Sequence, residues 1–341
     1  MARYTIRQIA ELAGVSPATV SRVLNETVPV SPDLKERVMT AARQSGYTAV
    51  KNPESKSHLI GLLLPRLSNP FYTEIIQGIL DTASAAGFDV VIRPAIVSGM
   101  NSFNKNPSLF YKTTKLAGLL TLSRLRSDGW LLRSLPEELP IVQCCEYNES
   151  LSYPVVSIDH YSAAYKATKY LLGTGHSNLA FFNSSCQTLY GKKREEGFLK
   201  ALADCRTPVR QDWILHLGDV DYNLALAAAK ELFSKKDHPD AIFAVSDLYA
   251  AGIVKGLAEL GLQVPGDVSV VGFDDTEIAL VNTPTLTTIH QPRHKLGATA
   301  CNILLQLIQS ETTVSQYYWV ESDLIVRGST KSKLPIYEPG I

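Results

Sequence analysis

The sequence lacks an excess of charge of either sign and lacks any long apolar run. Lys plus Arg number 33 and Asp plus Glu also number 33, so the formal net charge is zero. Bulk charge therefore indicates neither a nucleic-acid partner nor a membrane surface. No stretch approaches the roughly 18 uninterrupted apolar residues that a transmembrane helix needs. Arg3, Arg7 and Glu11 interrupt the first residues, so we expect no secretory signal peptide.

Cysteine is scarce, and its spacing matches no disulfide framework or zinc motif. The count is odd and no C-x-x-C pair occurs. Two cysteines are neighbours in a predicted strand, so we expect their side chains on opposite faces. We interpret all five as ordinary buried thiols. They are Cys144, Cys145, Cys186, Cys205 and Cys301.

Signature motifs of enzymes are missing as well. There is no G-x-S-x-G nucleophile turn, no phosphate-binding P-loop and no G-x-G-x-x-G dinucleotide fingerprint. His216 and Asp219 lie close in the sequence, but nothing around them indicates metal ligation. The sequence therefore predicts a protein that is not an enzyme and that carries no cofactor and no metal.

The chain does contain two short helical patterns near its start. Apolar side chains recur at helical spacing across residues 6–13 and again across residues 20–24. Thr5 can cap the first helix and Ser16 the second, because both offer a side-chain oxygen to free backbone N–H groups. Gly14 between them tolerates a sharp reversal of the backbone. The stretch is typical of a helix–turn–helix.

The second of these helices leaves small or polar side chains on its outer face. An arginine there can form two hydrogen bonds with O6 and N7 of a guanine, and small apolar groups can contact thymine methyls. Residues 1–60 hold eight basic against five acidic residues, a small surplus that suits specific docking. The alternative is a helical bundle that binds nothing. The outward residues are Pro17, Ala18, Ser21, Arg22 and Asn25.

The run AGVSPATVSRVLN (13–25) resembles the headpiece of the lactose-repressor/galactose-repressor (LacI/GalR) family of bacterial transcription regulators. A third helical pattern, capped by Ser31, fits that family too. The resemblance implies a repressor that binds double-stranded operator DNA as a homodimer or tetramer. We expect Arg22 to read a guanine, with Pro17 and Ala18 against methyl or backbone groups. Hydroxyl groups at the edge of the helix pair are candidates for phosphate contacts, namely those of Thr5, Ser16 and Ser21.

From residue 59 onward, short apolar runs alternate with helical stretches. Runs such as VSVVGFD (268–274) predict strands of parallel sheets that are covered on both faces. The resemblance implies two α/β lobes, like those of a periplasmic binding protein, with a ligand cleft between them. The expected fold is thus an all-α helix–turn–helix headpiece and linker (1–58), a two-lobed α/β effector-binding and dimerisation core (59–330) and a frayed tail (331–341).

Several segments carry narrower predictions. Linker residues 47–58 contain Pro53 and no leucine, so they depart from the hinge helix of the resembled family, and a flexible tether is the alternative. Residues 97–113 receive no element and no role. TLTTIHQP (285–292) is expected at a crossover between lobes, with His290 as a satisfied core residue. YWVESDLIVRGS (318–329) is expected to close the core.

Residues suited to a polar ring ligand follow four predicted strands, where ligands of parallel sheets bind. LSNPFYTEI carries Phe71 and Tyr72, GKKREEGF carries Arg194, AVSDLYAAG carries Asp247, and VVGFDD carries Asp274 and an exposed neighbour, Asp275. The alternatives are core packing for the aromatic pair, a solvated charge run for the arginine and a helix cap for Asp247. The resemblance implies that four of these residues line the effector pocket, namely Phe71, Tyr72, Arg194 and Asp274. Further candidates are Tyr147, Tyr190 and Tyr222.

The chemistry of these residues favours a small sugar or sugar phosphate as effector. A carboxylate such as that of Asp274 accepts hydroxyl hydrogen bonds, and the guanidinium of Arg194 donates them. We therefore expect a cytoplasmic, sequence-specific repressor whose operator affinity a sugar controls, with no membrane partner. Two alternatives stay open. One is the same regulator with a purine or nucleoside effector, and the other is a sugar-binding protein without a regulatory role.

Overall fold

The computed structural model describes residues 6–24, 30–45, 57–94, 114–127, 129–309 and 315–331. Internal contacts divide the chain into two units, Met1–Ser57 and His58–Ile341. Within the described residues, no helix combines the length and the apolar character that crossing a bilayer requires. Some predictions fall outside the described residues, and these concern Thr5, Asn25, linker residues 47–56, residues 97–113 and tail residues 332–341.

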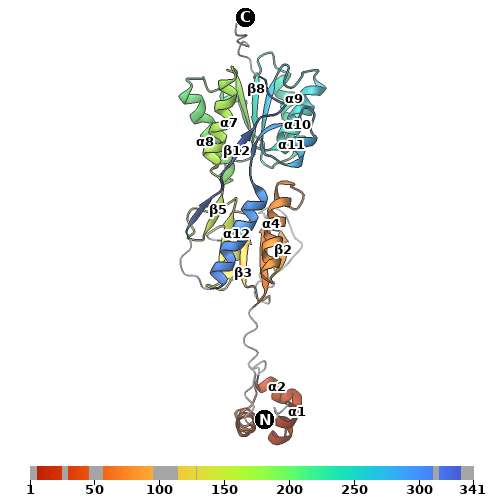
Figure 1. The fold of residues 1–341 in the computed structure, drawn as a ribbon, viewed down its shortest axis with the longest axis vertical. Coiled ribbons are helices and arrows are strands. Elements are labelled where there is room, and N and C mark those ends of the chain that lie inside the picture. Colours follow the sequence, from red (N-terminus) through yellow and green to blue (C-terminus); the bar gives the residue numbers. More distant parts are fainter. Residues whose placement is uncertain are drawn as a thin grey trace, which may run out of the picture. The chain divides into compact units, whose positions relative to one another are not determined.

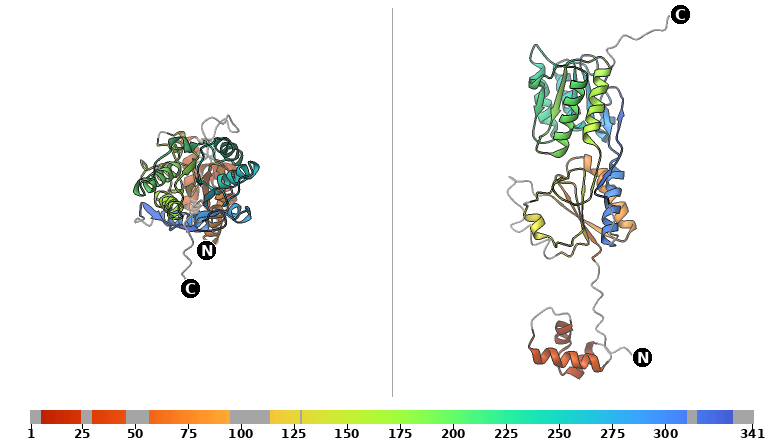
Figure 2. Two further views of the ribbon diagram at one scale, coloured as in Figure 1. Left: turned by 90° about the horizontal axis from the view of Figure 1, so that it is seen from above. Right: turned by 90° about the vertical axis from the view of Figure 1, so that its left-hand side faces the viewer.

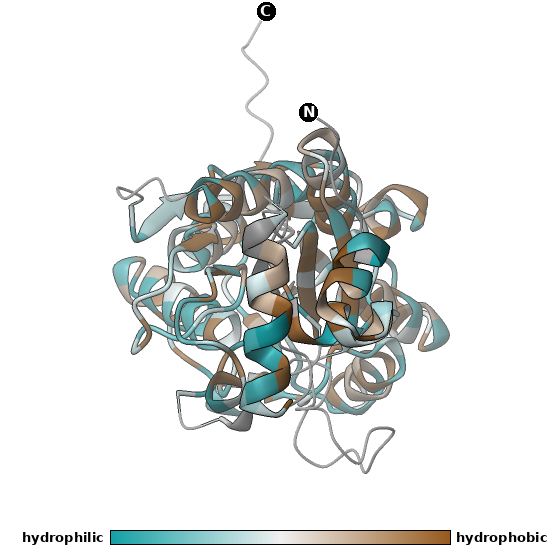
Figure 3. Ribbon diagram, turned by 90° about the horizontal axis from the view of Figure 1, so that it is seen from below, coloured by the Kyte–Doolittle hydropathy of each residue, from teal (hydrophilic) through white to brown (hydrophobic). Residues whose placement is uncertain are grey.

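The described residues of the N-terminal unit form three helices around a small core, as the sequence predicted. They are α1 (Ile6–Ala13), α2 (Pro17–Leu24) and α3 (Pro32–Gln44). Ile9, Val20 and Val38 are fully buried between them. In Figure 3 brown and teal alternate along the helices, as expected where each helix has one buried apolar face. The Arg37 guanidinium of α3 donates to the carbonyl of Ala13 at 2.9 Å, which satisfies a free acceptor at the end of α1.

The second unit is built on two six-stranded sheets, each of which forms one lobe (Figure 1). The first sheet has the order β11-β5-β4-β3-β1-β2, and all its strand pairs are parallel. Its strands carry apolar residues on both faces, because helices or loops cover both sides. They are β1 (Leu59–Leu64), β2 (Asp89–Pro94), β3 (Gly118–Thr121), β4 (Ile141–Cys144), β5 (Val155–Ser157) and β11 (Tyr317–Trp319).

The second sheet has the order β12-β10-β9-β8-β6-β7. Its pairs are parallel except at one edge, where β12 runs antiparallel to β10. The two-lobed α/β fold with predominantly parallel sheets is therefore confirmed. The strands are β6 (Leu179–Asn183), β7 (Ile214–His216), β8 (Ala241–Ala244), β9 (Ser269–Asp274), β10 (Thr287–His290) and β12 (Asp323–Ile325).

Helices cover the sheets in pairs. In the first lobe α4 (Phe71–Ala85) and α12 (Arg293–Ile308) lie side by side, and short α6 (Trp130–Ser134) lies on the opposite side of the sheet (Figure 2). In the second lobe α7 (His160–Gly173) packs on α8 (Leu189–Asp204), and α9 (Tyr222–Phe233) packs on α10 (Asp247–Glu259). The remaining short elements are η1 (Gln211–Trp213) and α11 (Glu277–Val281).

Within the described ranges, the chain passes between the lobes three times, at residues 157–160, 290–293 and 319–323. The second passage confirms the crossover predicted for TLTTIHQP. The third divides the stretch 318–329, which the sequence suggested as one closing segment. Its start pairs with β5 in the first lobe, and its later part pairs with β10 in the second lobe.

Side-chain caps set the starts of two helices in the second lobe. The Thr188 hydroxyl accepts from the Gly191 amide at 3.2 Å and begins α8. The Asp221 carboxylate accepts from two amides, including that of Asn223 at 2.8 Å, and begins α9. Such caps can be recognised in a sequence, because Thr and Asp are favoured at the position before a helix.

Predictions for the cysteines were partly wrong. Cys145 follows the end of β4 with a φ of 66°, so it is not in extended conformation and its sulfur lies 3.6 Å from that of Cys144. Neighbouring side chains point to opposite faces only within a regular strand. Cys186 is exposed and Cys205 is half-buried, whereas Cys144, Cys145 and Cys301 are buried as expected.

His290 and Asp275 reverse their expected environments. The His290 side chain, expected in the core, is 41% exposed, and its Nδ1 lies 2.9 Å from the carboxylate of Asp275. Asp275, expected at the surface, is only 14% exposed and also pairs with Arg327 at 2.7 Å. Asp275, which follows β9, thus contacts both the end of β10 and the segment after β12. These contacts join residues that are distant in sequence.

Candidate functional site

The first candidate surface is the outer face of α2 in the N-terminal unit. Pro17, Ala18 and Arg22 are exposed and Ser21 is half-buried. Ser16 caps the helix, because its Oγ accepts from the Thr19 amide at 3.1 Å. These residues share one short helix whose other face is buried. The helix therefore presents an arginine and small side chains to the solvent, which is an arrangement that fits a DNA major groove.

The second candidate site is a cavity between the two lobes of the second unit, with a volume of about 50 Å³. It lies beyond the carboxyl ends of strands from both sheets, as expected for α/β proteins. The first lobe contributes Asn69, Phe71, Tyr72, Cys145 and Glu146. The second lobe contributes His160, Tyr190, Arg194, Val220, Val245, Ser246 and Asp274.

Arg194 is the central cation of this cavity, although its side chain is only 5% exposed. Its guanidinium carbon lies 3.4 Å from the centre of the Phe273 ring, a cation–π contact. One Nη donates to the carbonyl of Val245, and the other lies 3.7 Å from a carboxylate oxygen of Asp274. Within the described part of the chain, its Nε has no hydrogen-bond acceptor. Arg194 is thus a buried donor with free capacity and not a member of a solvated charge run.

Asp274 ends β9 and faces Arg194 across the cavity wall. Its φ of 108° lies in a region that L-residues rarely adopt, and such strain concentrates at functional positions. The Gln291 amide donates to its carboxylate at 2.7 Å. Burial raises the pKa of Asp274 to about 6, against the opposing effect of the Arg194 charge. The site therefore contains a buried carboxylate beside a buried guanidinium.

Aromatic rings form another wall. The rings of Phe71 and Tyr72 meet edge to face with centroids 5.2 Å apart, and Tyr72 is buried while Phe71 is half-buried. The Tyr190 ring lies 5.0 Å from the Arg194 guanidinium carbon, and its hydroxyl accepts from Ser184 Oγ at 3.1 Å. The cavity therefore combines π faces with a charged pair, which suits a ligand with both a flat ring and hydroxyl groups.

Four polar residues of the cavity were missed by sequence reasoning, namely Asn69, Glu146, His160 and Ser246. Glu146 follows β4 and is buried, and burial raises its pKa. His160 begins α7, with Nδ1 3.3 Å from an Arg194 nitrogen. Burial and then the Arg194 charge lower the pKa of His160, so its imidazole is neutral. Their position directly after predicted strands was an available signal, but no motif singled them out.

Three sequence candidates lie outside the cavity lining. Tyr147 packs its ring 6.2 Å from that of Tyr317 in a small separate cluster. Tyr222 is the first residue of α9 and does not line the cavity. Asp247 is fully buried and is not the cap of α10, because Ser246 fills that role.

Asp247 instead joins three elements of the second lobe. Its carboxylate accepts from the Thr276 amide at 2.7 Å and from the Thr288 hydroxyl at 2.6 Å. Burial, followed by the nearby Asp274, raises the pKa of Asp247 to about 8. The residue therefore stabilises the wall behind Asp274 without facing the cavity.

Comparison with family models matches both units. Residues 5–49 match the model described as bacterial regulatory proteins, lacI family. Residues 57–327 match the model described as periplasmic binding proteins and sugar binding domain of the LacI family. The two matches together include the outer face of α2 and the whole cavity.

Curated relatives resemble the chain over nearly its full length. The HTH-type transcriptional repressor CytR of Escherichia coli is 34% identical over 337 residues, which cover 96% of both chains. The HTH-type transcriptional repressor PurR of Vibrio parahaemolyticus is 29% identical over 332 residues, 96% of this chain and 98% of the relative. A solved complex of the transcriptional regulator CelR with cellobiose has a TM-score of 0.73 at 29% identity, covering 96% of this chain and all of that one.

Proposed function

The chain belongs to the LacI family of bacterial regulatory proteins, and from this premise we propose which side chains bind its DNA and its effector. Membership makes it a DNA-binding transcriptional regulator and not an enzyme, as the sequence predicted. We propose that it acts in the cytoplasm as a repressor. Two copies of the chain then place one α2 helix on each half-site of a pseudo-palindromic operator, because the two-fold symmetry of a dimer matches that of the two half-sites.

Contacts to operator DNA are assigned to the outer face of α2. Arg22 is exposed there, next to the small side chains of Pro17 and Ala18. A guanidinium on a helix in the major groove reads guanine through two hydrogen bonds. Ser16 and Ser21, with Thr5 and Asn25, are assigned supporting contacts that position the helix.

The effector site is assigned to the cavity between the lobes. The observation that carries this assignment is the Arg194–Asp274 pair. These two buried side chains of opposite charge both line the cavity, and their nearest nitrogen and oxygen atoms are 3.7 Å apart, which is too long for a tight hydrogen bond. A buried guanidinium with a free Nε needs a ligand acceptor to compensate its desolvation. Hydroxyl groups on one ring can accept from Arg194 and donate to Asp274 together.

The effector we propose is a small ring with vicinal hydroxyl groups, foremost a free sugar or sugar phosphate. A nucleoside is the second candidate, because the aromatic side chains of Phe71, Tyr72 and Tyr190 line the cavity and a flat base can stack on such rings. The named relatives include repressors called PurR and CytR as well as a regulator crystallised with cellobiose.

A screen of ligands against the full chain tests this assignment and distinguishes the two classes. Thermal unfolding is measured with sugars, sugar phosphates, nucleosides and purines, each in excess. A true effector at 100 times its dissociation constant adds about 2.7 kcal/mol to the stability of the folded state. The same ligand must then change the affinity for operator DNA, because the two binding equilibria are reciprocally coupled. Absence of any stabilising ligand in both classes would overturn the proposed chemistry.

A further inference from the structure

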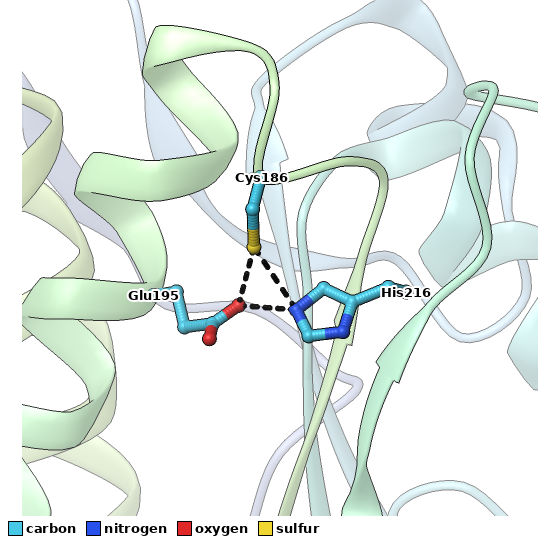
Figure 4. Close-up of side chains that lie close together, drawn as sticks. All are labelled: Cys186, Glu195 and His216. Carbon is cyan, nitrogen blue, oxygen red and sulfur yellow. Dashed lines mark hydrogen bonds and ion pairs between the residues drawn. The ribbon is translucent and has the colours of Figure 1, made fainter.

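A cluster of three potential metal ligands lies on the second lobe, away from the residues that line the cavity (Figure 4). Cys186 stands in the connection between β6 and α8, Glu195 on α8, and His216 at the end of β7. Figure 4 shows the three side chains pointing toward one common point. We infer that Cys186, Glu195 and His216 form a binding site for a divalent transition metal ion of the zinc class.

The three donor atoms are already close enough for one ion. Cys186 Sγ lies 3.1 Å from His216 Nε2 and 3.3 Å from Glu195 Oε2, and the last two atoms are 2.6 Å apart. A tetrahedral zinc ion with bonds of about 2.0–2.3 Å holds its ligand atoms roughly 3.3–3.7 Å from one another. The cluster therefore needs to expand by about 1 Å or less, which side-chain rotations provide.

The chemistry of the donor set selects the class of ion. A thiolate, an imidazole and a carboxylate are together the ligands of zinc and its neighbours. Calcium and magnesium instead require six or more oxygen ligands, which this cluster does not offer. Three protein ligands leave a fourth position for water, as in zinc sites that remain open.

Neighbouring structure holds the ligands in place. Asn183 donates to Glu195 Oε2 at 2.9 Å, and such supporting hydrogen bonds orient metal ligands. Asn183 and His216 are also register partners on the parallel strands β6 and β7. Cys186 is exposed and the His216 side chain is 44% exposed, so an ion can enter from solvent.

Without the ion, protons take its place among the three groups. The Cys186 thiol can donate its proton to Glu195 Oε2, which lies 3.3 Å from the sulfur. Metal binding releases that proton to solvent and forms the bond to sulfur. An ion there would cross-link the connection 184–188, which leads directly to Tyr190 of the cavity.

Cobalt(II) is a suitable probe, because it takes zinc sites and its thiolate bond gives a charge-transfer absorption band. The full chain without an affinity tag, freed of metal, is titrated with cobalt chloride. We expect one ion per chain and a thiolate–cobalt band that zinc abolishes and magnesium leaves unchanged. Cys186→Ser should remove the band and weaken binding on the order of 100-fold, and His216→Gln should weaken binding at least about tenfold.

Cys205→Ser is the matched control, because Cys205 is a partly accessible thiol outside the cluster. It should keep both the band and the affinity. Thermal unfolding of each metal-free variant establishes that it is folded, and zinc should raise the unfolding temperature of the native chain but not of Cys186→Ser. No cobalt band in the native chain, or an unchanged band in folded Cys186→Ser, overturns the site. Binding of several weak ions insensitive to both substitutions does so too.

Discussion

The carboxylate of Glu146 accepts a hydrogen bond from the backbone amide of Tyr190 at 2.9 Å, although the two residues belong to different lobes. A second bond, from the Leu189 amide, is 3.3 Å long. Both amides lie in the first turn of α8, where N–H groups have no partner within the helix and attract negative charge. A side chain after β4 of the first lobe thus holds the helix that carries Tyr190 and Arg194.

Replacement of Glu146 should therefore destabilise the second unit. Glu146→Ala leaves two amides of α8 without an acceptor, and we expect the free energy of unfolding to fall by about 1–3 kcal/mol in urea titrations. Glu149→Ala is the control, since Glu149 is an exposed residue three positions later and should change little. Equal stability of both variants would contradict the role assigned to Glu146.

Arg22→Ala should relax base preference in the operator. Loss of a bidentate contact to guanine is expected to reduce discrimination at one base pair by about 1–3 kcal/mol. Fluorescence anisotropy with single-base operator variants at fixed salt measures this effect. Arg22→Lys keeps the charge but not the fork of donors, so it should also lose discrimination while retaining salt-dependent binding. An unchanged operator profile in both variants would refute the assignment.

Asp274→Asn should abolish the effector response while operator binding without effector stays intact. The substitution keeps the shape of the side chain but removes the charge that faces Arg194. The measurement is operator affinity with and without the ligand found by the thermal screen. Tyr147→Phe is the contrasting variant, because Tyr147 lies outside the cavity lining and should preserve the response. Persistence of the response in Asp274→Asn would place the effector elsewhere.

A methyl group at Gly297 should disrupt the packing of α12 on α4. A Cβ at this position would lie 2.0 Å from the carbonyl oxygen of Ile75. The backbone cannot yield as a flexible side chain does, so Gly297→Ala should lower the unfolding free energy by at least about 1–3 kcal/mol. Gly173→Ala is the control, because no atom lies within 4 Å of its Cβ position. Gly173→Ala should be neutral or should stabilise the fold by about 0.4–1 kcal/mol. A comparable loss of stability in Gly173→Ala and Gly297→Ala would argue against close contact between α12 and α4.

Stability should fall as pH rises toward 8, because of buried carboxyl groups. Burial raises the pKa of Asp247 from 3.8 to about 8, so between these values the folded state binds more protons than the unfolded state. The stability that Asp247 contributes is thus fully present below pH 3.8, and it is lost as the pH rises through the folded-state pKa of about 8. Urea unfolding from pH 5 to pH 8 should show this decline in the native chain and a smaller one in Asp247→Asn.

Asp212→Asn serves as the control for this titration. Hydrogen bonding to Arg210 lowers the pKa of Asp212, so its titration falls below the pH range measured. The variant should therefore keep the slope of the native chain. A native chain whose stability rises from pH 5 to pH 8 would contradict the proposed protonation of Asp247.

Much of the architecture was predictable from local patterns. The apolar spacing of residues 6–24 gave the helix pair, because a short amphipathic helix has few other ways to bury its side chains. Near-continuous apolar strands predicted predominantly parallel sheets covered on both faces. Asp274 was a candidate because polar residues directly after buried strands lie at the same sheet edge. Arg194 was assigned to the pocket only by the family resemblance, since the local sequence also fits a solvated charge run.

Other features depended on pairings between residues distant in sequence. Glu146 and His160 belong to no local pattern and enter the cavity only because the lobes meet there. Asp247 looked equally suited to the cavity, but the hydroxyl of Thr288 and the amide of Thr276 hold it behind the wall. Cys145 does not continue strand β4, because its φ is positive, and this angle could not be predicted from the apolar pattern.

The sequence by itself determined that this protein has a helix–turn–helix with an outward Arg22 and a core of alternating strands and helices, because helix caps and apolar periodicity act within a few residues of one another. The division of that core into two lobes came from the family resemblance. Only the tertiary structure decided which polar side chains meet. Cys186, Glu195 and His216 lie on three separate elements, and the register of β6 with β7 and the packing of α8 bring them together. Such a meeting depends on the geometry of the whole sheet, which no short stretch of sequence specifies.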